Sequence, residues 1–344
     1  MSKQLIIVLS LIVIVVGIFM TMPRQDNMQV TSSRSDNPTK THVKNSERSL
    51  QMDKVPTRYR QLAVASARGK VERLTYQGTY ENKTYSKDAL VYLPVGYSKN
   101  PTKRYDIVYL MHGWSMRSDD FLGGVGTTQK SPFKRMLDHA IAEKRMKPLI
   151  VVTPTYYPDR SFVTNSWSDD DPLDLRFATH ELPKDLIPAV EQRYRTYATS
   201  THLKELSATR NHRAFAGFSM GAITTWYVFE YQLNLFKYFM PMAGDSWTVE
   251  ENGGLTAPAK TANKLAAQVA RTDYQANDYM ISASVGSADS TSGQMSPLIA
   301  ELRKHSQQFT DRNLLYRTDQ GGGHDVDSCI NQAYNSLPLF FSTN

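Results

Sequence analysis

One serine in this chain has the neighbours that a catalytic nucleophile requires. Ser219 stands at the centre of Gly217-Phe218-Ser219-Met220-Gly221, a Gly-x-Ser-x-Gly pattern. An apolar run precedes the pattern and a stretch able to form a helix follows it. Glycines on both sides leave room for a sharp, strained strand-to-helix turn, and the helix start directs free N–H groups at charge developing on a substrate oxygen. The pattern predicts that Ser219 attacks a carbonyl carbon.

A serine needs a base to take its proton, and His324 has the sequence context of such a base. Gly321-Gly322-Gly323 precede it, so a loop can bring the imidazole over Ser219. Asp289 would then orient the ring and stabilise the imidazolium. Other readings exist for both residues: His324 stands beside a helix start, and aspartate favours the N-cap position. Asp245 is a rival for the role of the acid.

Further candidates surround these three. The backbone N–H groups of Met220 and Trp114 are the expected donors to the oxyanion. His112 is expected to shape the loop that carries Trp114 rather than to act as a second base. Candidate substrate-binding residues are the aromatics that follow predicted strands or precede an acidic run: Trp247, Tyr156, Tyr157 and Trp167.

Alternating strand and helix patterns must position these side chains. Strands are expected at 71–81, 88–93, 105–111, 149–153, 213–218, 239–243, 279–285 and 314–317, and helices at 133–141, 182–194 (with a kink at Pro188), 222–231, 259–271 and 296–305. Such alternation predicts an α/β fold with a mostly parallel central sheet and helices on both faces. Ser219, Asp289 and His324 each follow a strand, in the chain order of the α/β-hydrolase fold.

Composition excludes several classes of function. The chain has 344 residues, 40% hydrophobic, with a formal net charge of +7 and no basic run interleaved with aromatics, so a nucleic-acid partner is not expected. A single cysteine, Cys329, excludes an internal disulfide and a cysteine-based metal cluster. The remaining histidines have no metal-ligand spacing, and Asp169-Asp170-Asp171 is interpreted as a solvated loop rather than a calcium site. We expect no metal and no cofactor.

The first 55 residues differ from the rest. Residues 1–21 contain the apolar run Leu5–Met20, which is expected to be a signal peptide or an uncleaved membrane anchor. Residues 22–55 are polar and lack periodicity, and are interpreted as a disordered linker. The catalytic domain is then residues 56–344, and the expected location is extracytoplasmic, at the cell surface or secreted.

With these residues in hand, the chain resembles the esterase D-like α/β hydrolases, particularly the feruloyl esterases of carbohydrate esterase family 1. The resemblance runs from about residue 71 to the C-terminus and is carried by Tyr109-Leu110-Met111-His112-Gly113, Glu181-Leu182-Pro183-Lys184-Asp185-Leu186-Ile187-Pro188, Arg213 to Gly221, Gly244-Asp245-Ser246-Trp247 and Gly321 to Asp325. It implies that Ser219 is the nucleophile, His324 the base and Asp289 the acid. Two residues depart from the family pattern: Trp114 replaces a small residue, which predicts a narrower acyl pocket, and Phe218 replaces a frequent leucine.

The sequence therefore predicts a serine carboxylic-ester hydrolase with an acyl-enzyme intermediate. Its expected substrate is a small or polysaccharide-linked ester of the feruloyl or cinnamoyl type, and the membrane is an expected partner through the N-terminal segment. Alternatives are a mycolyltransferase-like acyltransferase of the cell envelope, a short-chain acyl or acetyl esterase, a peptidase, and a binding protein on an inactive hydrolase fold.

Overall fold

The computed structural model describes residues 51–128 and 130–341, and one eight-stranded sheet organises them. The strands are β1 (Lys70–Tyr80), β2 (Lys83–Leu93), β3 (Ile107–Met111), β4 (Ile150–Thr153), β5 (Arg213–Phe218), β6 (Tyr238–Met242), β7 (Met280–Gly286) and β8 (Leu314–Asp319). Their order across the sheet is β1-β2-β4-β3-β5-β6-β7-β8. From β4 to β8 all neighbours are parallel, whereas β1 and β2 are antiparallel to their neighbours. The predicted mostly parallel sheet is confirmed.

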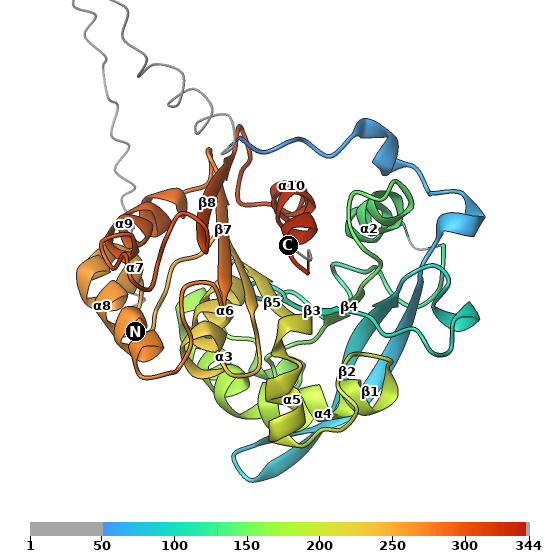
Figure 1. Ribbon diagram of the computed structural model, residues 1–344, viewed down its shortest axis with the longest axis horizontal. Helices are drawn as coiled ribbons and strands as arrows, with labels where there is room; N and C mark the ends of the chain where they lie inside the picture. The colour runs from blue at the N-terminus through green and yellow to red at the C-terminus, as the bar shows by residue number, and fades with distance from the viewer. Residues whose placement is uncertain (1–50, 129, 342–344) are drawn as a thin grey trace, which may run out of the picture. The chain divides into compact units, whose positions relative to one another are not determined.

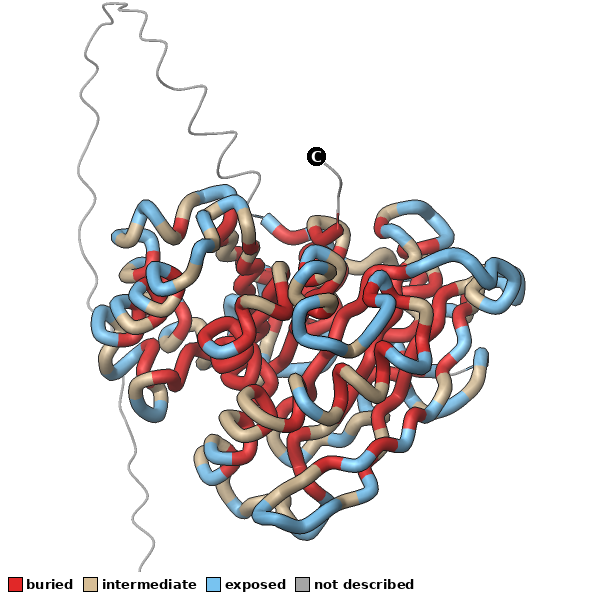
Figure 2. The backbone as a smooth tube through the Cα atoms, turned by 60° about the horizontal axis from the view of Figure 1, so that its bottom comes forward, coloured by how far each residue is buried: buried red, intermediate tan, exposed pale blue. Residues whose placement is uncertain are grey.

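Helices cover both faces of the sheet, which explains why its central strands are apolar on both sides. The helices are α2 (Pro132–Ala142), α3 (Asp171–Arg176), α4 (Ile187–Arg193), α5 (Leu203–Ala208), α6 (Met220–Tyr231), α7 (Gly253–Thr256), α8 (Pro258–Ala270), α9 (Ser292–Leu302) and α10 (Val326–Ser336). α2 and α10 lie side by side against one face, and α6 and α3 lie against the other (Figure 1). Every residue of β3, β5 and β6 is buried, as expected for covered parallel strands. Figure 2 shows the buried segments in the interior and the exposed residues mainly in the outer loops.

The helix predicted at 182–194 is longer than its sequence pattern indicates. Helical residues run without interruption from Asp171 to Arg193, and the turns of η6 (Phe177–Leu186) are wide π turns around Pro183. Pro188 does not break the helix, because helical residues continue on both sides of it, from η6 into α4. The irregular stretch precedes it.

The second strand of the N-terminal hairpin is also longer than predicted. β2 begins at Lys83 rather than at residue 88, and the hairpin is in register from the pair Tyr80–Lys83 to the pair Lys70–Leu93. Its two-residue turn consists of Glu81 and Asn82, both with positive φ (46° and 63°). Such a turn matches the twist of the flanking strands.

The catalytic domain begins earlier than the predicted residue 56. Residues 51–55, which we call the N-terminal strap, lie against the body instead of belonging to a disordered linker. Gln51 pairs with Thr318, just beside the end of β8. The strap also makes three hydrogen bonds to α10: Asp53 N–H donates to Asn335 (2.9 Å), Asn335 donates to the Asp53 carbonyl (2.8 Å) and Val55 N–H donates to Asn331 (3.0 Å).

The predicted signal peptide or anchor (1–21) and residues 22–50 of the predicted linker lie outside the described residues. In the ranges 51–128 and 130–341, no helix has both the length and the apolar character needed to cross a bilayer.

Candidate active site

Ser219 lies at a sharp turn between β5 and α6, as its sequence context predicts. Its backbone has φ 58° and ψ −121°, a strained conformation for a residue with a side chain. Neighbouring backbone fixes this turn: Ser219 N–H donates to the carbonyl of Met242 at the end of β6 (3.0 Å). A Cβ at Gly217 would come within 1.9 Å of the carbonyl oxygen of Gly221, so the turn requires glycine there.

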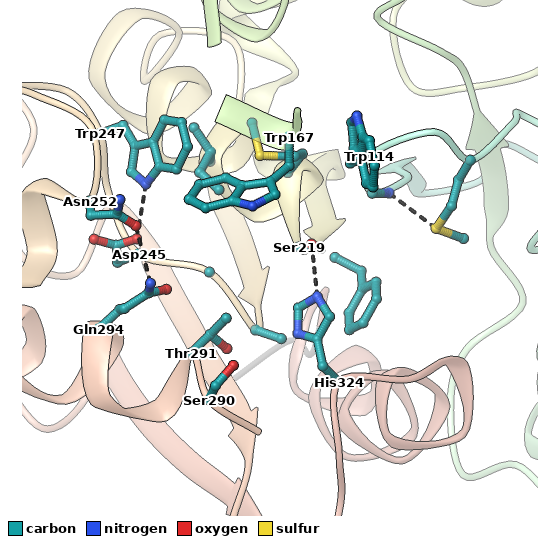
Figure 3. Close-up of a pocket in the computed structure, with 17 residues that line it drawn as sticks. Trp114, Trp167, Ser219, Asp245, Trp247, Asn252, Ser290, Thr291, Gln294 and His324 are labelled. Carbon is teal, nitrogen blue, oxygen red and sulfur yellow. Dashed lines mark hydrogen bonds between the residues drawn. The ribbon is translucent and has the colours of Figure 1, made fainter. Parts of the chain in front are cut away.

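His324 reaches Ser219 from the loop after β8. Its Nε2 lies 2.9 Å from the Ser219 Oγ (Figure 3). Its Nδ1 lies 2.9 Å from the Asp289 Oδ2. The ring also packs against Phe218, with 4.9 Å between ring centroids. Gly286 at the end of β7 permits the close approach of this loop, because a Cβ there would lie 2.2 Å from the carbonyl oxygen of Gly322. The structure thus brings together the three side chains that the sequence nominated.

Asp289 follows β7, and hydrogen bonds fix its carboxylate beside the imidazole of His324. Only 2% of the residue is exposed. One carboxylate oxygen meets His324, and the other accepts from the backbone N–H and the hydroxyl of Thr291 (2.8 and 2.7 Å). Burial alone would raise the pKa of Asp289, but the hydrogen bonds from His324 and Thr291 together lower it below the ordinary value. The carboxylate is therefore ionised and fixed at neutral pH.

The rival acid, Asp245, has other partners. Its Oδ1 accepts from the indole N–H of Trp247 (3.0 Å) and its Oδ2 from the backbone N–H of Gly254 (2.7 Å). Burial raises its pKa to about 6, and these hydrogen bonds only partly offset that effect. Asp245 thus fixes a wall of the neighbouring pocket and the start of α7, and does not meet His324.

The two expected oxyanion donors lie beside Ser219. Within the described residues, neither Trp114 N–H nor Met220 N–H has a hydrogen-bond acceptor in the protein. The carbonyl of Gly113, on the same peptide unit as Trp114 N–H, lies 2.8 Å from the His112 Nδ1. The other nitrogen of His112 lies 2.8 Å from the hydroxyl of Thr155, and burial lowers the pKa of His112 to about 4. His112 is thus a neutral residue that shapes the loop, as predicted.

A pocket of about 460 Å³ opens at Ser219. Trp167 and Trp247 form one wall, with 5.4 Å between ring centroids, and Trp114 stands on the opposite side of Ser219 (Figure 3). The two predicted tyrosines do not line this pocket. Tyr156 and Tyr157 are each only 1% exposed and lie behind the loop that carries Trp114, because both phenols bond to the buried carboxylate of Asp170.

Sequence reasoning missed the polar end of the pocket. Asn252 and Gln294 line it beyond the tryptophans and bond to one another (3.1 Å), and Ser290 and Thr291 form its floor near Asp289 (Figure 3). Asn252 lies in the left-handed region (φ 52°), and Gln294 lies in the first turn of α9. Neither residue stands at a strand end or in a motif, so only their neighbours in space identify them.

The acidic run 169–171 is not the predicted solvated loop, because Asp170 at its centre is buried. Asp170 is buried and accepts from Tyr156, Tyr157 and Thr164, and Asp171 accepts from Tyr227 (2.6 Å). These carboxylates are acceptors of tyrosine and threonine hydroxyls. Among the described residues, no group of three or more histidine, cysteine, aspartate or glutamate side chains has the geometry of a metal site.

Comparisons with known proteins place the chain among esterases. The family model described as "Putative esterase" matches residues 86–329. Endo-1,4-beta-xylanase Y of Acetivibrio thermocellus is 32% identical over 278 residues, which are 79% of this chain and 23% of that protein. An endo-1,4-beta-xylanase/feruloyl esterase of Xylanibacter ruminicola is 27% identical over 53% of this chain and 23% of its own length. The chain thus spans about a quarter of each of these two relatives.

A solved structure resembles the chain more completely. It is the feruloyl esterase module from Clostridium thermocellum complexed with sinapinate, with a TM-score of 0.71 and 32% sequence identity. The match covers 85% of this chain and 94% of that module. Taken with the family match, this shows that the chain belongs to the esterase D-like family of α/β hydrolases and is a carboxylic ester hydrolase that resembles the feruloyl esterases.

Proposed function

We propose that the chain cleaves feruloyl-type esters through a Ser219–His324–Asp289 triad and an acyl-enzyme intermediate. The observation that carries the proposal is the continuous hydrogen-bond chain from the Ser219 hydroxyl through His324 to Asp289, at the mouth of an aromatic-walled pocket. Asp289 accepts a hydrogen bond from Nδ1–H, which leaves the Nε2 lone pair free to accept a hydrogen bond from the serine hydroxyl. This tautomer is the one that general-base catalysis needs.

The chemistry follows in two balanced steps. In the first, the Ser219 Oγ forms a bond to the ester carbonyl carbon while its proton moves to His324 Nε2, and the carbonyl electrons move onto the oxyanion, where the N–H groups of Met220 and Trp114 stabilise them. The C–O bond to the alcohol then breaks, and the alcohol leaves with the proton from His324. In the second step, water attacks the acyl-enzyme by the same proton route and releases the acid and free Ser219. No step needs a cofactor.

The pocket supports an aromatic acyl group. Apolar and aromatic walls with a few polar side chains are typical of small-molecule sites, and here the indoles of Trp167 and Trp247 offer faces on which a phenyl ring can stack. Asn252 and Gln294 lie at the end away from Ser219, where the ring substituents of a hydroxycinnamoyl group would reach (Figure 3). The related Clostridium thermocellum module is named a feruloyl esterase and was solved with sinapinate, which supports the same substrate class.

We also propose an extracytoplasmic location, with residues 1–21 as signal or anchor, 22–50 as linker and the hydrolase domain beyond. The support is the apolar run Leu5–Met20 and the polar segment after it. Polysaccharide-linked esters are accessible to an exported enzyme. Fractionation of cells that express the full chain should find the enzyme in the membrane or the medium. Enzyme confined to the cytosol would contradict this part of the proposal.

The decisive experiment compares the full chain with Ser219→Ala on methyl ferulate, p-nitrophenyl acetate and acetylated xylan. We expect ferulate release by the wild type and a loss of kcat of at least ~10³-fold in Ser219→Ala, as for other serine nucleophiles. Ser296→Ala, an exposed serine on α9, is the matched control and should retain full activity. Residual turnover in Ser219→Ala near the wild-type level would refute the mechanism. Activity on acetyl esters alone would refute the acyl specificity, and acyl transfer to a sugar hydroxyl in preference to water would identify an acyltransferase.

A further inference from the structure

The loop that carries Trp114 N–H has nearly all of its peptide groups bonded. Gly113 C=O accepts from Met116 N–H (3.2 Å) and faces His112, and Gly113 N–H points at the sulfur of Met116 (3.3 Å). Ser115 is held in the left-handed region, with φ 59°. Because a left-handed non-glycine residue costs free energy, contacts outside the loop must hold it there.

Two residues from the segment after β4 make those outside contacts. The phenol oxygen of Tyr157 accepts from Ser115 N–H (2.9 Å). The guanidinium of Arg160 donates to the carbonyls of Ser115 (2.9 Å) and Met116 (2.7 Å), and it lies 5.5 Å from the centroid of the Tyr157 ring. Every peptide unit from 113 to 117 is thereby fixed through at least one atom, and Trp114 N–H remains free to face the substrate.

Asp170 fixes the phenol in turn. Its Oδ2 accepts the hydroxyl protons of Tyr157 and of Tyr156 (2.8 Å for the latter), and its Oδ1 accepts from Thr164 (2.8 Å). Burial raises the pKa of the Tyr157 hydroxyl above its ordinary value, so the phenol keeps its proton. It donates a hydrogen bond to Asp170 and presents a lone pair to Ser115 N–H. Asp170 is fully buried and ends η5 (Trp167–Asp170), the short helix that carries the pocket tryptophan.

We propose that Tyr157, Asp170 and Arg160 form a clamp that positions the oxyanion peptide of Trp114, and that none of the three touches the substrate. The clamp holds the loop at Ser115 and Met116, so that the Trp114 N–H is aimed before the oxyanion forms. A donor that needs no reorganisation in the transition state lowers the barrier more than one that must first be oriented. The inference rests on the proposed function, since it assigns positioning residues to the same reaction.

The structure offers a matched pair for the test. Tyr157 and Tyr156 are adjacent, equally buried and bonded to the same Asp170 oxygen, but only Tyr157 contacts the loop. Tyr157→Phe removes the acceptor for Ser115 N–H, whereas Tyr156→Phe removes its hydrogen bonds to Asp170 (2.8 Å) and to the Tyr157 hydroxyl (3.3 Å) but leaves that acceptor in place. Loss of an oxyanion donor costs about 10²- to 10³-fold in kcat, and a displaced donor should cost less. We expect kcat to fall about 10- to 100-fold in Tyr157→Phe and by less than about threefold in Tyr156→Phe, with KM for methyl ferulate within about threefold in both.

Two further readouts distinguish positioning from a general structural effect. A boronic acid that forms a tetrahedral adduct on Ser219 needs the oxyanion donors, so its inhibition constant should weaken in parallel with kcat in Tyr157→Phe. The fall in kcat should be the same on p-nitrophenyl acetate, whose acyl group is too small to use Trp167. Arg160 is exposed, so Arg160→Met tests the clamp even if Tyr157→Phe fails to fold, and it should also lower kcat by about 10-fold with KM little changed.

Each outcome bears on one claim. Wild-type kcat in Tyr157→Phe would overturn the clamp, and if Tyr157→Phe does not fold, wild-type kcat in Arg160→Met would do so. The proposed function would still stand in that case, provided that Ser219→Ala is inactive. Equal losses in Tyr156→Phe and Tyr157→Phe would also overturn it, because the effect would then come from Asp170 and the core around it. Full activity of Ser219→Ala would overturn the proposed function itself.

Discussion

Two buried aspartates beside Ser219 show how environment assigns different roles to the same side chain. Asp289 accepts three hydrogen bonds, one of them at His324, and stays ionised, whereas burial raises the pKa of Asp245 to about 6 and its carboxylate holds Trp247 and Gly254. The first holds the ring of His324, and the second holds a wall of the pocket.

Substitution by asparagine should separate these roles. Asp289→Asn reverses the hydrogen bond to His324 Nδ1 and favours the wrong imidazole tautomer, so kcat should fall at least ~10²-fold with little change in KM. Asp245→Asn leaves that tautomer intact and loosens Trp247, so KM for methyl ferulate should rise several-fold while kcat changes by less than about fivefold. Steady-state kinetics on both variants checks this expectation, and the opposite ranking of kcat losses would assign the acid role to Asp245.

His112 makes stability depend on pH. In the folded chain burial lowers the pKa of His112 from 6.5 to about 4, so between these values the unfolded state binds a proton that the folded state does not. The contribution of neutral His112 is present above about pH 6.5 and is lost as the pH falls toward about 4.

The difference in unfolding free energy between the wild type and His112→Gln, whose amide does not titrate, should therefore fall by about 2 kcal/mol from pH 7 to pH 4.5. Urea unfolding at several pH values measures this difference. A difference that does not change with pH would mean that His112 has the same pKa in the folded and unfolded chain.

The turn between β5 and α6 depends on the absence of side chains at two positions. A Cβ at Gly221 would lie 2.4 Å from the carbonyl oxygen of Met111 in β3, so the start of α6 packs directly on the backbone of the neighbouring strand. Backbone atoms cannot move aside as a flexible side chain can. The clash must therefore displace the nucleophile turn itself.

Gly221→Ala should accordingly destabilise the fold by several kcal/mol and reduce activity, as expected for overpacking against rigid backbone. Gly293→Ala is the matched control, because nothing lies within 4 Å of a Cβ there and the position is in the first turn of α9. This second variant should be neutral or more stable by up to about 1 kcal/mol. Thermal melting of both proteins decides the matter, and a Gly221→Ala protein as stable as the wild type would contradict the close packing.

At the scale of elements, local sequence predicts the strands better than the pocket. Buried parallel strands are short apolar runs, so each predicted strand is present, and β5 has the predicted bounds. The side chains at strand ends follow from the same pattern. In contrast, Asn252 and Gln294 meet only because α7 packs on α9, and the partner of Tyr157 is a buried aspartate in an acidic run that resembles a surface loop. Contacts between segments that are distant in the sequence determine these positions, and the periodicity of one sequence contains no information about such contacts.

At the scale of the whole described chain, the N-terminal strap is bonded to β8 and α10, the two elements on either side of the loop that carries His324. Lys54 donates to Asp319 at the end of β8 (2.6 Å), and this carboxylate is wholly buried whereas the lysine side chain is 56% exposed. Asp319 also accepts from Ser328 in α10 (3.0 Å). One carboxylate thus joins the strap, the last strand and the last long helix, and it does so five residues before His324.

Lys54→Ala should lower the unfolding free energy by about 1 kcal/mol, less than for a fully buried pair because water screens the half-exposed ammonium. Lys70, with a side chain 55% exposed and a partner, Glu72, that is 27% exposed, provides the control. Lys70→Ala should change stability by less than about 0.5 kcal/mol. Chemical denaturation of the full chain with each substitution tests the difference, and equal losses would show that burial of Asp319 does not matter.

The acyl pocket and the proton-transfer chain are built from different stretches of polypeptide. Trp247 and Asn252 come from the connection between β6 and β7, and Trp167 comes from the segment after β4, whereas Ser219, Asp289 and His324 follow β5, β7 and β8. Mutation can therefore remodel the first set while the second is inherited unchanged. Descendants of one ancestral enzyme can in this way diverge in the esters they accept without losing the ability to cleave them.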